Sequence, residues 1–391
     1  MNNEAYFADL HIHIGRTQMG RPVKITGAQS LTLENILKAA KKPKGLDIVG
    51  VIDCHSPEVR EEIRTLIGSG GLAPLKGGGL LYQGKVTLIP GVEIEVYDEN
   101  CLGPVHVLAY FPELAALDAF SGWYAARVAN PHLSTQRIRA GAKELQQKVK
   151  ALDGMFIPAH VFTPFKSLYG KGVERSLEEV LDPDLIDAVE LGLSSDTDMA
   201  DRIGELHRYP FVTNSDAHSL AKIAREYQMV ALESPSFNAL LKAFRNEGGN
   251  RIIANYGLNP KLGKYYTTTC AKCRQPVSSG ICPHCGSPLK TKGVSGRIEE
   301  LADAQPLNTR PPYIHQVPLE FLPGLGPKTM AKLLDHFGTE MDILHRVPEE
   351  ALREVVNLSL SDLIVKARAG MLALDSGGGG KYGKVKQKKP R

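Results

Sequence analysis

The first 257 residues of the sequence predict an α/β fold of the β/α-barrel type, and two observations support this. Short apolar runs alternate with helix-like segments, which is typical of βαβ units and a mainly parallel sheet. About seven such runs in about 250 residues is close to the content of a β/α barrel, with a doubly wound open sheet as the alternative. After Tyr256 the sequence becomes turn-rich and then helical, which predicts smaller additional domains.

The expected strands are short and apolar, and helix-like segments separate them. The strands include Ile48–Ile52, Val86–Ile89, Val105–Tyr110, Met155–Pro158, Ile186–Leu191 and Phe211–Thr213. The helix-like segments include Leu33–Lys41, Glu58–Ile67, Gln136–Leu152 and Met199–His207. The predicted organisation is a barrel domain at 1–257, a cysteine-rich domain at 258–290, a linker at 291–318, a helical domain at 319–375 and a basic disordered tail at 376–391.

Charge is unevenly distributed along the chain. Residues 1–257 hold 27 Lys and Arg against 31 Asp and Glu, whereas residues 258–391 hold 20 against 12. A basic C-terminal part favours a polyanionic partner, with a merely solvated tail as the alternative. The N-terminus lacks the pattern of a signal peptide, and no apolar run approaches the length of a membrane span. We therefore expect a cytoplasmic protein without a membrane partner.

Histidine and acidic residues follow the predicted strands. Because residues two apart on a strand face the same side, His11 and His13 can hold one ion, and so can Asp216 and His218. The C-terminal strand ends of a β/α barrel form its active site, so imidazole and carboxylate groups there predict a metal centre. The candidate residues are Asp9, His11, His13, Asp53, His55, Glu93, His106, His160, Asp216 and His218.

This pattern resembles the polymerase and histidinol phosphatase (PHP) superfamily over about residues 4–257. The resemblance implies a distorted (β/α)7 PHP-type barrel that binds up to three divalent metals, which would be Zn, Mn, Mg or Fe. It assigns His11, His13, Glu93 and Asp216 to one metal, Glu93, His106 and His160 to a second, and His55 and His218 to a third. Some relatives carry another histidine shortly after the first motif, where this chain has Gly15–Gly20 without one.

Clustered divalent ions favour phosphoester hydrolysis, because they activate water and stabilise the leaving oxygen. The expected catalytic residues are Asp53, Asp216 and His218, with Asp53 either binding metal or bracing a ligand. Glu190 is expected to support the ligands from behind, and His132 to lie outside the metal set. The isolated Cys54 and Cys101 are expected to be packing residues.

The remaining four cysteines form two CxxC pairs separated by eight residues: Cys270, Cys273, Cys282 and Cys285. This spacing predicts a tetrahedral zinc site. Four thiolates complete the coordination sphere and leave no open position, so the zinc is expected to be structural. Such a ribbon either contacts nucleic acid or braces a domain junction, and the sequence leaves both open.

The segment Leu322–Leu334 resembles a helix-hairpin-helix motif, with Pro327 as the first residue of its second helix. Backbone amides of such a hairpin bind a DNA phosphate without reading bases. A plain helical hairpin is the alternative. A second copy at Val356–Asp362 lacks the glycines and is degenerate or absent. The residues expected to contact DNA are Gly324, Gly326, Lys328 and Lys332.

A PHP hydrolase, a four-Cys ribbon and a helix-hairpin-helix, in this order, resemble the endonuclease Q family over nearly the whole chain. The resemblance implies a DNA repair endonuclease that cuts on the 5′ side of uracil, hypoxanthine and xanthine, and at abasic sites. Damaged duplex DNA is then the partner, and replication or repair proteins are candidate protein partners. Arg16 and Lys24, after the first metal motif, are expected to contact phosphate or base. The alternatives are a PHP-type small-molecule phosphatase and a non-catalytic DNA-binding or polymerase-associated PHP protein.

Overall fold

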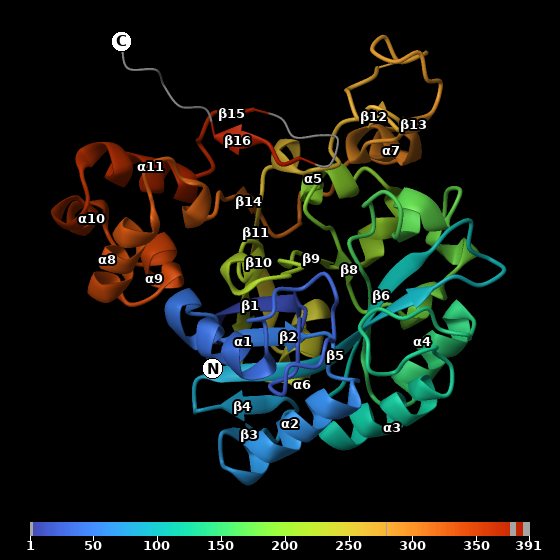
Figure 1. Ribbon diagram of the computed structural model, residues 1–391, viewed down its shortest axis with the longest axis horizontal. Helices are drawn as coiled ribbons and strands as arrows, with labels where there is room; N and C mark the ends of the chain where they lie inside the picture. Colours follow the sequence, from blue (N-terminus) through green and yellow to red (C-terminus); the bar gives the residue numbers. More distant parts are fainter. Residues whose placement is uncertain (1–2, 279, 376–380, 386–391) are drawn as a thin grey trace.

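The structure is a computed structural model that describes residues 3–278, 280–375 and 381–385. A large twisted sheet lies at its centre, with the C-terminal helices on one side and the cysteine-rich segment above (Figure 1). Among the described residues its strand order is β14-β11-β10-β1-β2-β5-β4-β3, and β6 pairs with both β5 and β7. The strands are β1 (Glu4–Ile12), β2 (Ile48–Val51), β3 (Leu72–Pro74), β4 (Leu80–Tyr82), β5 (Val86–Val96), β6 (Val105–Tyr110), β7 (Met155–Pro158), β10 (Tyr227–Leu232), β11 (Arg251–Gly257) and β14 (Tyr313–His315).

The sheet is more antiparallel than the sequence predicts. β1, β2 and β5 run parallel, so their carboxyl ends meet at one edge. β6 is antiparallel to β5 because the short connection of residues 97–104 returns the chain beside the strand it has just left. β10 is antiparallel to both of its neighbours, β1 and β11. The expected α/β class is confirmed, whereas the expectation of a mainly parallel sheet is wrong.

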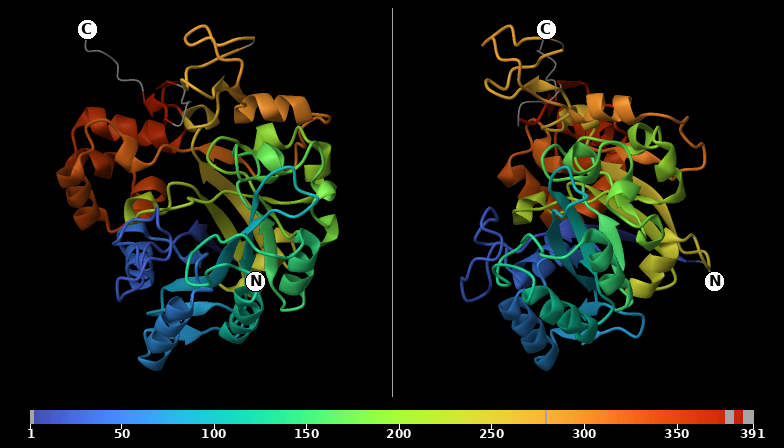
Figure 2. Two further views of the ribbon diagram at one scale, coloured as in Figure 1. Left: turned by 45° about the vertical axis from the view of Figure 1, so that its right-hand side comes forward. Right: turned by 90° about the vertical axis from the view of Figure 1, so that its right-hand side faces the viewer.

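Helices cover the outside of this sheet (Figure 2). The Thr32 side chain accepts a hydrogen bond from the amide of Asn35 and so caps the first helix, and Pro57 begins the second. None of the helices in the described ranges is long and apolar enough to cross a bilayer. The helices of this part are α1 (Leu33–Ala39), α2 (Pro57–Gly68), α3 (Leu114–Ala125), α4 (Ala142–Lys150), α5 (Thr197–Ala200) and α6 (Phe237–Phe244).

The central strands bury charged side chains together with apolar ones. All of β5 is buried, including Glu93 and Glu95, and β1 buries Asp9 and His11 beside Leu10. Charged groups are buried at reasonable cost only where they are paired or bind ions. The interior of the sheet is therefore where a functional site is expected.

Residues 291–318, predicted as a linker, are structured. They contain α7 (Val294–Leu301), where Arg297 donates to backbone carbonyls of the 169–174 segment. Arg310 pairs with the buried carboxylate of Asp201 at 2.8 Å, and β14 adds to β11 as a parallel edge strand. The linker prediction is wrong because it used only the local prolines, whereas long-range contacts anchor this segment. The sheet is completed by residues beyond position 257.

The C-terminal helices are docked on the sheet through a histidine in an aromatic box. The His345 ring stacks on Phe7 of β1 at a centroid distance of 4.6 Å and meets the edge of Tyr256 at 4.8 Å. The Tyr227 hydroxyl lies 2.6 Å from Nε2 of His345. Burial, with Arg368 and Arg346 nearby, lowers the pKa of His345 to about 4, so the ring is neutral. These helices are α8 (Pro327–Phe337), α9 (Glu340–His345), α10 (Glu349–Val355) and α11 (Leu358–Arg368).

A second contact joins the start of α9 to the loop before β2. The ammonium of Lys44, nearly buried, lies 3.0 Å from the Glu340 carboxylate. Gly45 adopts a φ of +82°, and a side chain there would come within 2.4 Å of the Thr339 hydroxyl. This close approach and the aromatic box hold the C-terminal helices in a fixed orientation on the sheet.

Part of the segment predicted as a disordered tail is paired instead. β15 (Leu374–Asp375) and β16 (Lys384–Val385) form an antiparallel ribbon, and the amide of Gly383 donates to the carbonyl of Leu262 at 2.9 Å. The tail prediction relied on composition and missed the anchoring aromatic Tyr382. Residues 376–380 and 386–391 of that predicted tail lie outside the described residues.

We predict that Glu226→Gln stabilises the protein at alkaline pH. Glu226 is fully buried, and one carboxyl oxygen accepts from the amide of Leu258 at 2.8 Å. Burial raises its pKa well above the ordinary value, so the folded state retains a proton that the unfolded state releases. The protonated Glu226 therefore contributes its full stabilisation below the unfolded-state pKa of about 4.5, and this contribution falls as pH rises above that value. Glutamine removes this loss, worth about 1.4 kcal/mol per unit of pKa elevation.

Urea unfolding of the wild type and Glu226→Gln between pH 5 and 8 measures this effect. The gain in unfolding free energy should grow with pH. The exposed Glu247→Gln is the matched control, because it removes the same charge at the surface. Equal responses of the two variants to pH would show that Glu226 is ionised in the folded protein.

Candidate metal centre and nucleic-acid interface

The predicted ligands gather at the carboxyl ends of the central strands. In the described part of the chain, three groups in the barrel have potential ligand atoms within 4.8 Å of one another. These groups are His11, His13 and Glu93; His13, Asp216 and His218; and Glu93, His106 and His160. The shared members Glu93 and His13 join the three groups into one continuous cluster.

The first group is arranged as a binding site for a divalent ion. The Nε2 atom of His11 lies 3.7 Å from Glu93 and 3.6 Å from Asp216, and the Nε2 atom of His13 lies 3.5 Å from each. Ligands at about 2.1 Å from one metal lie roughly 3–3.5 Å apart, so these separations suit a shared ion. Both Nε2 atoms are buried without a hydrogen-bond partner among the described residues. A metal would satisfy them.

The other nitrogen of each histidine is held by a carboxylate. His11 Nδ1 lies 3.0 Å from Glu190, and His13 Nδ1 lies 3.0 Å from Asp53. Asp53 also accepts from the amide of Ile14 at 2.8 Å. Such contacts fix the tautomer that directs Nε2 to a metal. Between the two roles considered for Asp53, this geometry favours bracing a ligand over binding metal.

The second group is centred on the same glutamate. Glu93 Oε1 lies 2.9 Å from His106 Nδ1 and 3.4 Å from His160 Nε2. His160 has a φ of +31° and Asp216 a φ of +46°, a left-handed conformation that is uncommon outside glycine. Local strain of this kind persists where the surroundings enforce it, and it is found at functional sites.

His218 belongs to the cluster, but His55 does not. His218 Nδ1 lies 3.0 Å from the carbonyl of Asp216, which makes Nε2 the nitrogen available to a ligand. His55 Nε2 lies 3.1 Å from the carbonyl of Leu133, its ring packs edge-on against Tyr124, and it joins none of the groups. The buried Nδ1 of His55 has no hydrogen-bond partner among the described residues, so the assignment of His55 and His218 to one metal stays a prediction.

Lys24 lies inside the cluster and not at its edge. Its ammonium is 3.2 Å from Glu93 and 2.7 Å from the Thr135 hydroxyl. Burial lowers the pKa of Lys24, but Glu93, Asp53 and Asp216 outweigh that effect and raise it, so the side chain is charged. Lys24 therefore places a positive charge beside Glu93 within the ligand cluster.

The electrostatics of the cluster favour positive charge. Burial opposes an imidazolium at His11, but Glu190, Asp216 and Glu93 raise its pKa to about 10. Burial likewise raises the pKa of Glu93, but His106 and Lys24 hold it well below its usual range. The carboxylates are therefore ionised. Their negative charge favours a positive charge beside them, which either a protonated His11 or a bound divalent cation would supply.

Access to the cluster is from the side of Asp216 and His218. Their side chains are 33% and 35% exposed, whereas that of His11 is fully buried. A substrate phosphate would therefore approach these two residues first, which is consistent with the catalytic role expected for them.

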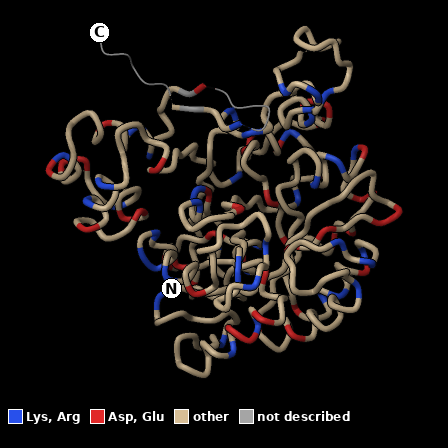
Figure 3. Tube along the Cα trace, in the orientation of Figure 1, with Lys and Arg blue, Asp and Glu red and all other residues tan. Residues whose placement is uncertain are grey.

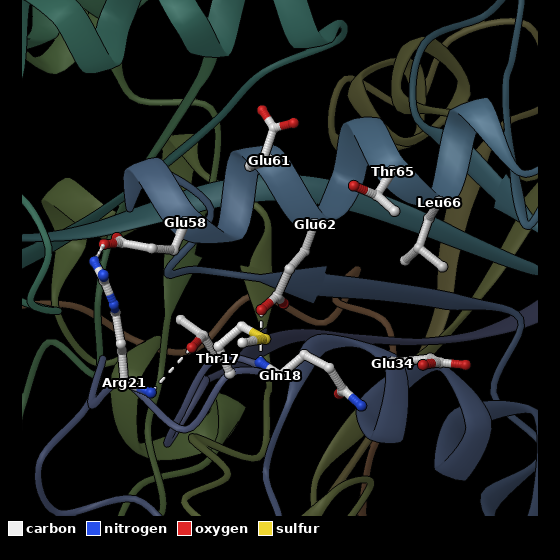
Figure 4. Close-up of a pocket in the computed structure, with 10 residues that line it drawn as sticks. Thr17, Gln18, Arg21, Glu34, Glu58, Glu61, Glu62, Thr65 and Leu66 are labelled. Carbon is white, nitrogen blue, oxygen red and sulfur yellow. Dashed lines mark hydrogen bonds and ion pairs between the residues drawn. The ribbon is translucent and has the colours of Figure 1, made fainter.

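The loop after the first metal motif, residues 15–21, contacts α2. Between them lies an acidic cleft of about 600 Å³ (Figure 4). Glu58 pairs with Arg21 at 2.6 Å, and Glu62 accepts from the amide of Gln18. Arg16 donates to the carbonyl of Gly20 at 2.9 Å and stabilises the loop from within. Glutamates repel phosphates, so the DNA backbone is not expected in this cleft. His132 also pairs with Glu58, outside the metal groups.

The four clustered cysteines converge as expected for a tetrahedral metal site. Sγ of Cys270 lies 3.5 Å from that of Cys285, and Sγ of Cys273 lies 3.5 Å from that of Cys282. Four sulfurs at about 2.3 Å from zinc are roughly 3.8 Å apart. The short strands β12 (Thr269–Cys270) and β13 (Lys290–Thr291) close this ribbon.

The hairpin before α8 has an open helix N-terminus. Gly324 has a φ of +84°, which favours glycine, whereas Gly326 has an ordinary φ of −80° and open space around it. Lys328 is exposed. The Lys332 ammonium donates to the carbonyl of Val355 at 2.5 Å, within the helical domain, and its contact with DNA stays a prediction.

Several supporting residues were missed by sequence reasoning. Thr135 donates to Glu93, the Ser134 hydroxyl lies 3.3 Å from His13 Nδ1, and the Asn214 amide donates to Glu190 at 2.8 Å. Arg225 donates to the carbonyls of Ser215 and Asp216. None of these has a ligand-type side chain at a strand end. Only the polar run Thr213–Ser215 before Asp216 could have indicated one of them.

Comparison with known proteins agrees with this architecture. Residues 195–247 match a family model described as PHP-associated. An uncharacterised Bacillus subtilis protein, YqxK, is 55% identical over 383 residues, covering 97% of this chain and 99% of the relative. The lesion-specific endonuclease Q of Pyrococcus furiosus is 32% identical, with a TM-score of 0.84, over 98% of this chain and 95% of that structure.

A second solved structure is endonuclease Q in complex with a 27-mer duplex that carries an abasic lesion at the active site. It is 31% identical to this chain, with a TM-score of 0.84, and the match covers 98% of this chain and 96% of that structure. The similarity extends over the barrel, the cysteine ribbon and the C-terminal helices alike. The chain therefore belongs to the endonuclease Q family and has the fold of the PHP metal-dependent hydrolases.

Proposed function

We propose that this protein is a metal-dependent DNA repair endonuclease that cuts the phosphodiester on the 5′ side of deaminated bases and at abasic sites. One observation carries the proposal. Buried imidazole nitrogens without partners converge on Glu93 and Asp216 at metal-ligand separations, in a chain that aligns from end to end with a lesion-specific endonuclease. A small-molecule phosphatase would have no use for the ribbon and hairpin.

In this proposal His11, His13, Glu93 and Asp216 hold one divalent ion, and His106 and His160 share Glu93 to hold a second. Bound divalent ions lower the pKa of water and stabilise the charge that develops on phosphate oxygens. His218, at the exposed side beside Asp216, reaches either an ion or the phosphate. Lys24 places a fixed positive charge at the same phosphate, and Asp53 and Glu190 keep the histidines in their binding tautomers.

The hairpin and α8 supply a non-specific grip on the DNA backbone. The open N-terminus of α8 at Gly326 offers amide donors and the positive end of the helix dipole to a phosphate, with Lys328 beside it. Neither group reads bases, so lesion choice lies with the barrel.

Most of the net positive charge of the C-terminal part lies at its end. Residues 381–391 hold six Lys and Arg and no acid, which leaves 14 Lys and Arg against 12 Asp and Glu in residues 258–380. Figure 3 shows both signs of charge on the C-terminal helices. Long-range attraction to DNA is therefore expected from the end of the chain, and precise docking from the hairpin.

The deciding experiment incubates the purified protein with labelled duplexes containing uracil, hypoxanthine, xanthine or an abasic site, with and without added Mn²⁺, Mg²⁺ or Zn²⁺. Cleavage on the 5′ side of the lesion, sensitive to chelator, is expected. Undamaged duplex and 4-nitrophenyl phosphate are the controls. Hydrolysis of the monoester without cutting of any lesion would overturn the proposal in favour of a phosphatase.

Ligand substitutions should separate cleavage from binding. Asp216→Ala and His11→Ala should abolish cutting and leave the dissociation constant for lesion duplex within about twofold, because the hairpin is unchanged. Asp53→Asn should lower metal affinity or activity by about 10- to 100-fold, as expected for a residue that orients a ligand. Metal content, single-turnover cleavage and fluorescence anisotropy provide the three measurements. Full activity in metal-free protein is incompatible with this mechanism.

The two hairpin glycines should behave differently. Gly326→Ala meets no steric obstacle in the protein, so its stability should be unchanged while its methyl group hinders an approaching phosphate and weakens DNA binding. Gly324→Ala is strained by the positive φ and should lower stability by about 1 kcal/mol. Gly122→Ala, in open space on α3, is the control. If Gly326→Ala changed lesion preference, specificity would have to be reassigned to the C-terminal helices.

Removing residues 386–391 should weaken the salt dependence of DNA binding. This segment contains four basic residues: Lys386, Lys388, Lys389 and Arg391. At about 0.9 per phosphate contact, the slope of log affinity against log salt should fall by up to about 3.6. Cleavage at saturating DNA should remain unchanged. An unaltered slope would mean that these charges do not contact the backbone.

A further inference from the structure

The last described residues of the chain lie against the loop that carries Asp216 and His218. β16 pairs with β15, and both lie between the C-terminal helices and the cysteine ribbon (Figure 1). The amide of Gly383 donates to Leu262, which belongs to the turn Pro260–Leu262 just after the barrel strands. Tyr382, immediately before Gly383, contacts Arg225, which in turn contacts the metal-ligand loop.

The partly buried Tyr382 side chain contacts charged and aromatic neighbours. Its hydroxyl accepts a hydrogen bond from Nη1 of Arg225 at 2.8 Å. The ammonium of Lys264 lies 4.6 Å from the centre of its ring, and the ring of Phe321 lies 6.3 Å away. Burial raises the pKa of Tyr382, so the hydroxyl stays protonated.

Arg225 transmits this contact to the metal-ligand loop. Its Nε donates to the carbonyl of Ser215 at 2.7 Å, and its Nη2 to the carbonyl of Asp216 at 3.3 Å. One planar guanidinium therefore joins Tyr382 to two consecutive carbonyls of the loop. The carbonyl of Asp216 is also the partner of His218 Nδ1 at 3.0 Å. The carbonyl of Asp216 therefore contacts both the Arg225 and the His218 side chains and helps to orient them.

The loop needs such support. Asp216 has a positive φ, which a non-glycine residue retains only where its surroundings enforce it. Its side chain and that of His218 are each about one third exposed, so the interior packing that holds His11 is missing on this side. The guanidinium of Arg225 supports the loop through its hydrogen bonds to the carbonyls of Ser215 and Asp216.

We propose that Tyr382 is a positioning residue of the metal centre: by fixing Arg225, it holds Asp216 and His218 in the geometry that binds metal. The C-terminal segment 381–383 is then part of the active site, and not only a basic extension. The cleavage readout of this inference rests on the proposed endonuclease function, but its metal-binding readout does not.

The test compares Tyr382→Phe, which removes only the hydroxyl, with Tyr6→Phe, which removes the same group where it donates to Glu4 at the surface. Mn²⁺ affinity by titration calorimetry, single-turnover cleavage and DNA affinity by anisotropy are measured on the full chain. Tyr382→Phe should lower Mn²⁺ affinity and the cleavage rate about 10-fold each, as for other groups that orient metal ligands, with DNA affinity within twofold. Tyr6→Phe should match the wild type in metal affinity and rate.

A double-mutant cycle with Arg225→Ala identifies the route of the effect. If Tyr382 acts through Arg225, Tyr382→Phe adds no further loss in the Arg225→Ala background. Additive losses would overturn the proposal, as would a Tyr382→Phe protein that matches Tyr6→Phe or that loses only DNA affinity. Thermal unfolding confirms that each variant is folded. If the wild type cut no lesion duplex, the proposed function would fail, and the Mn²⁺ titration would still decide the role of Tyr382.

Discussion

The metal centre is organised around one buried carboxylate. Oε1 of Glu93 faces His106 and His160, and Oε2 faces His13 and Lys24. An isolated carboxylate in this position would be very costly to bury, because the interior cannot replace its hydration. Histidines, lysine and metal must therefore assemble around it, and β5, buried along its whole length, keeps it in place. The same requirement explains why the three ligand groups form one connected cluster.

Local periodicity in the sequence was enough to find the residues that lie on single strands. The side chains of His11 and His13 face the same way because they are two residues apart, and their rings are 5.4 Å apart in the structure. The CxxC spacing likewise brought the four cysteines together, since each pair lies on one tight turn. Both cases depend on geometry over a few residues, which a pattern can encode.

Long-range packing could not be predicted in this way. His55 follows a strand as the other ligands do, but the carbonyl of Leu133 and the ring of Tyr124, both distant in sequence, engage it. The proline-rich 291–318 segment and residues 381–385 are anchored by side chains such as Arg310 and Tyr382. Composition describes the average behaviour of a segment, whereas one such contact determines where it lies.

The aromatic box around His345 connects two parts of the protein that otherwise seem separate. Phe7, on which the His345 ring stacks, is on β1 four residues before His11. The helices that present the hairpin are thus fixed to the very strand that carries the first metal ligands. In the proposed function, a duplex bound at α8 would therefore reach the metal centre at a fixed distance, which would determine how far the cut bond lies from the phosphate bound at the hairpin.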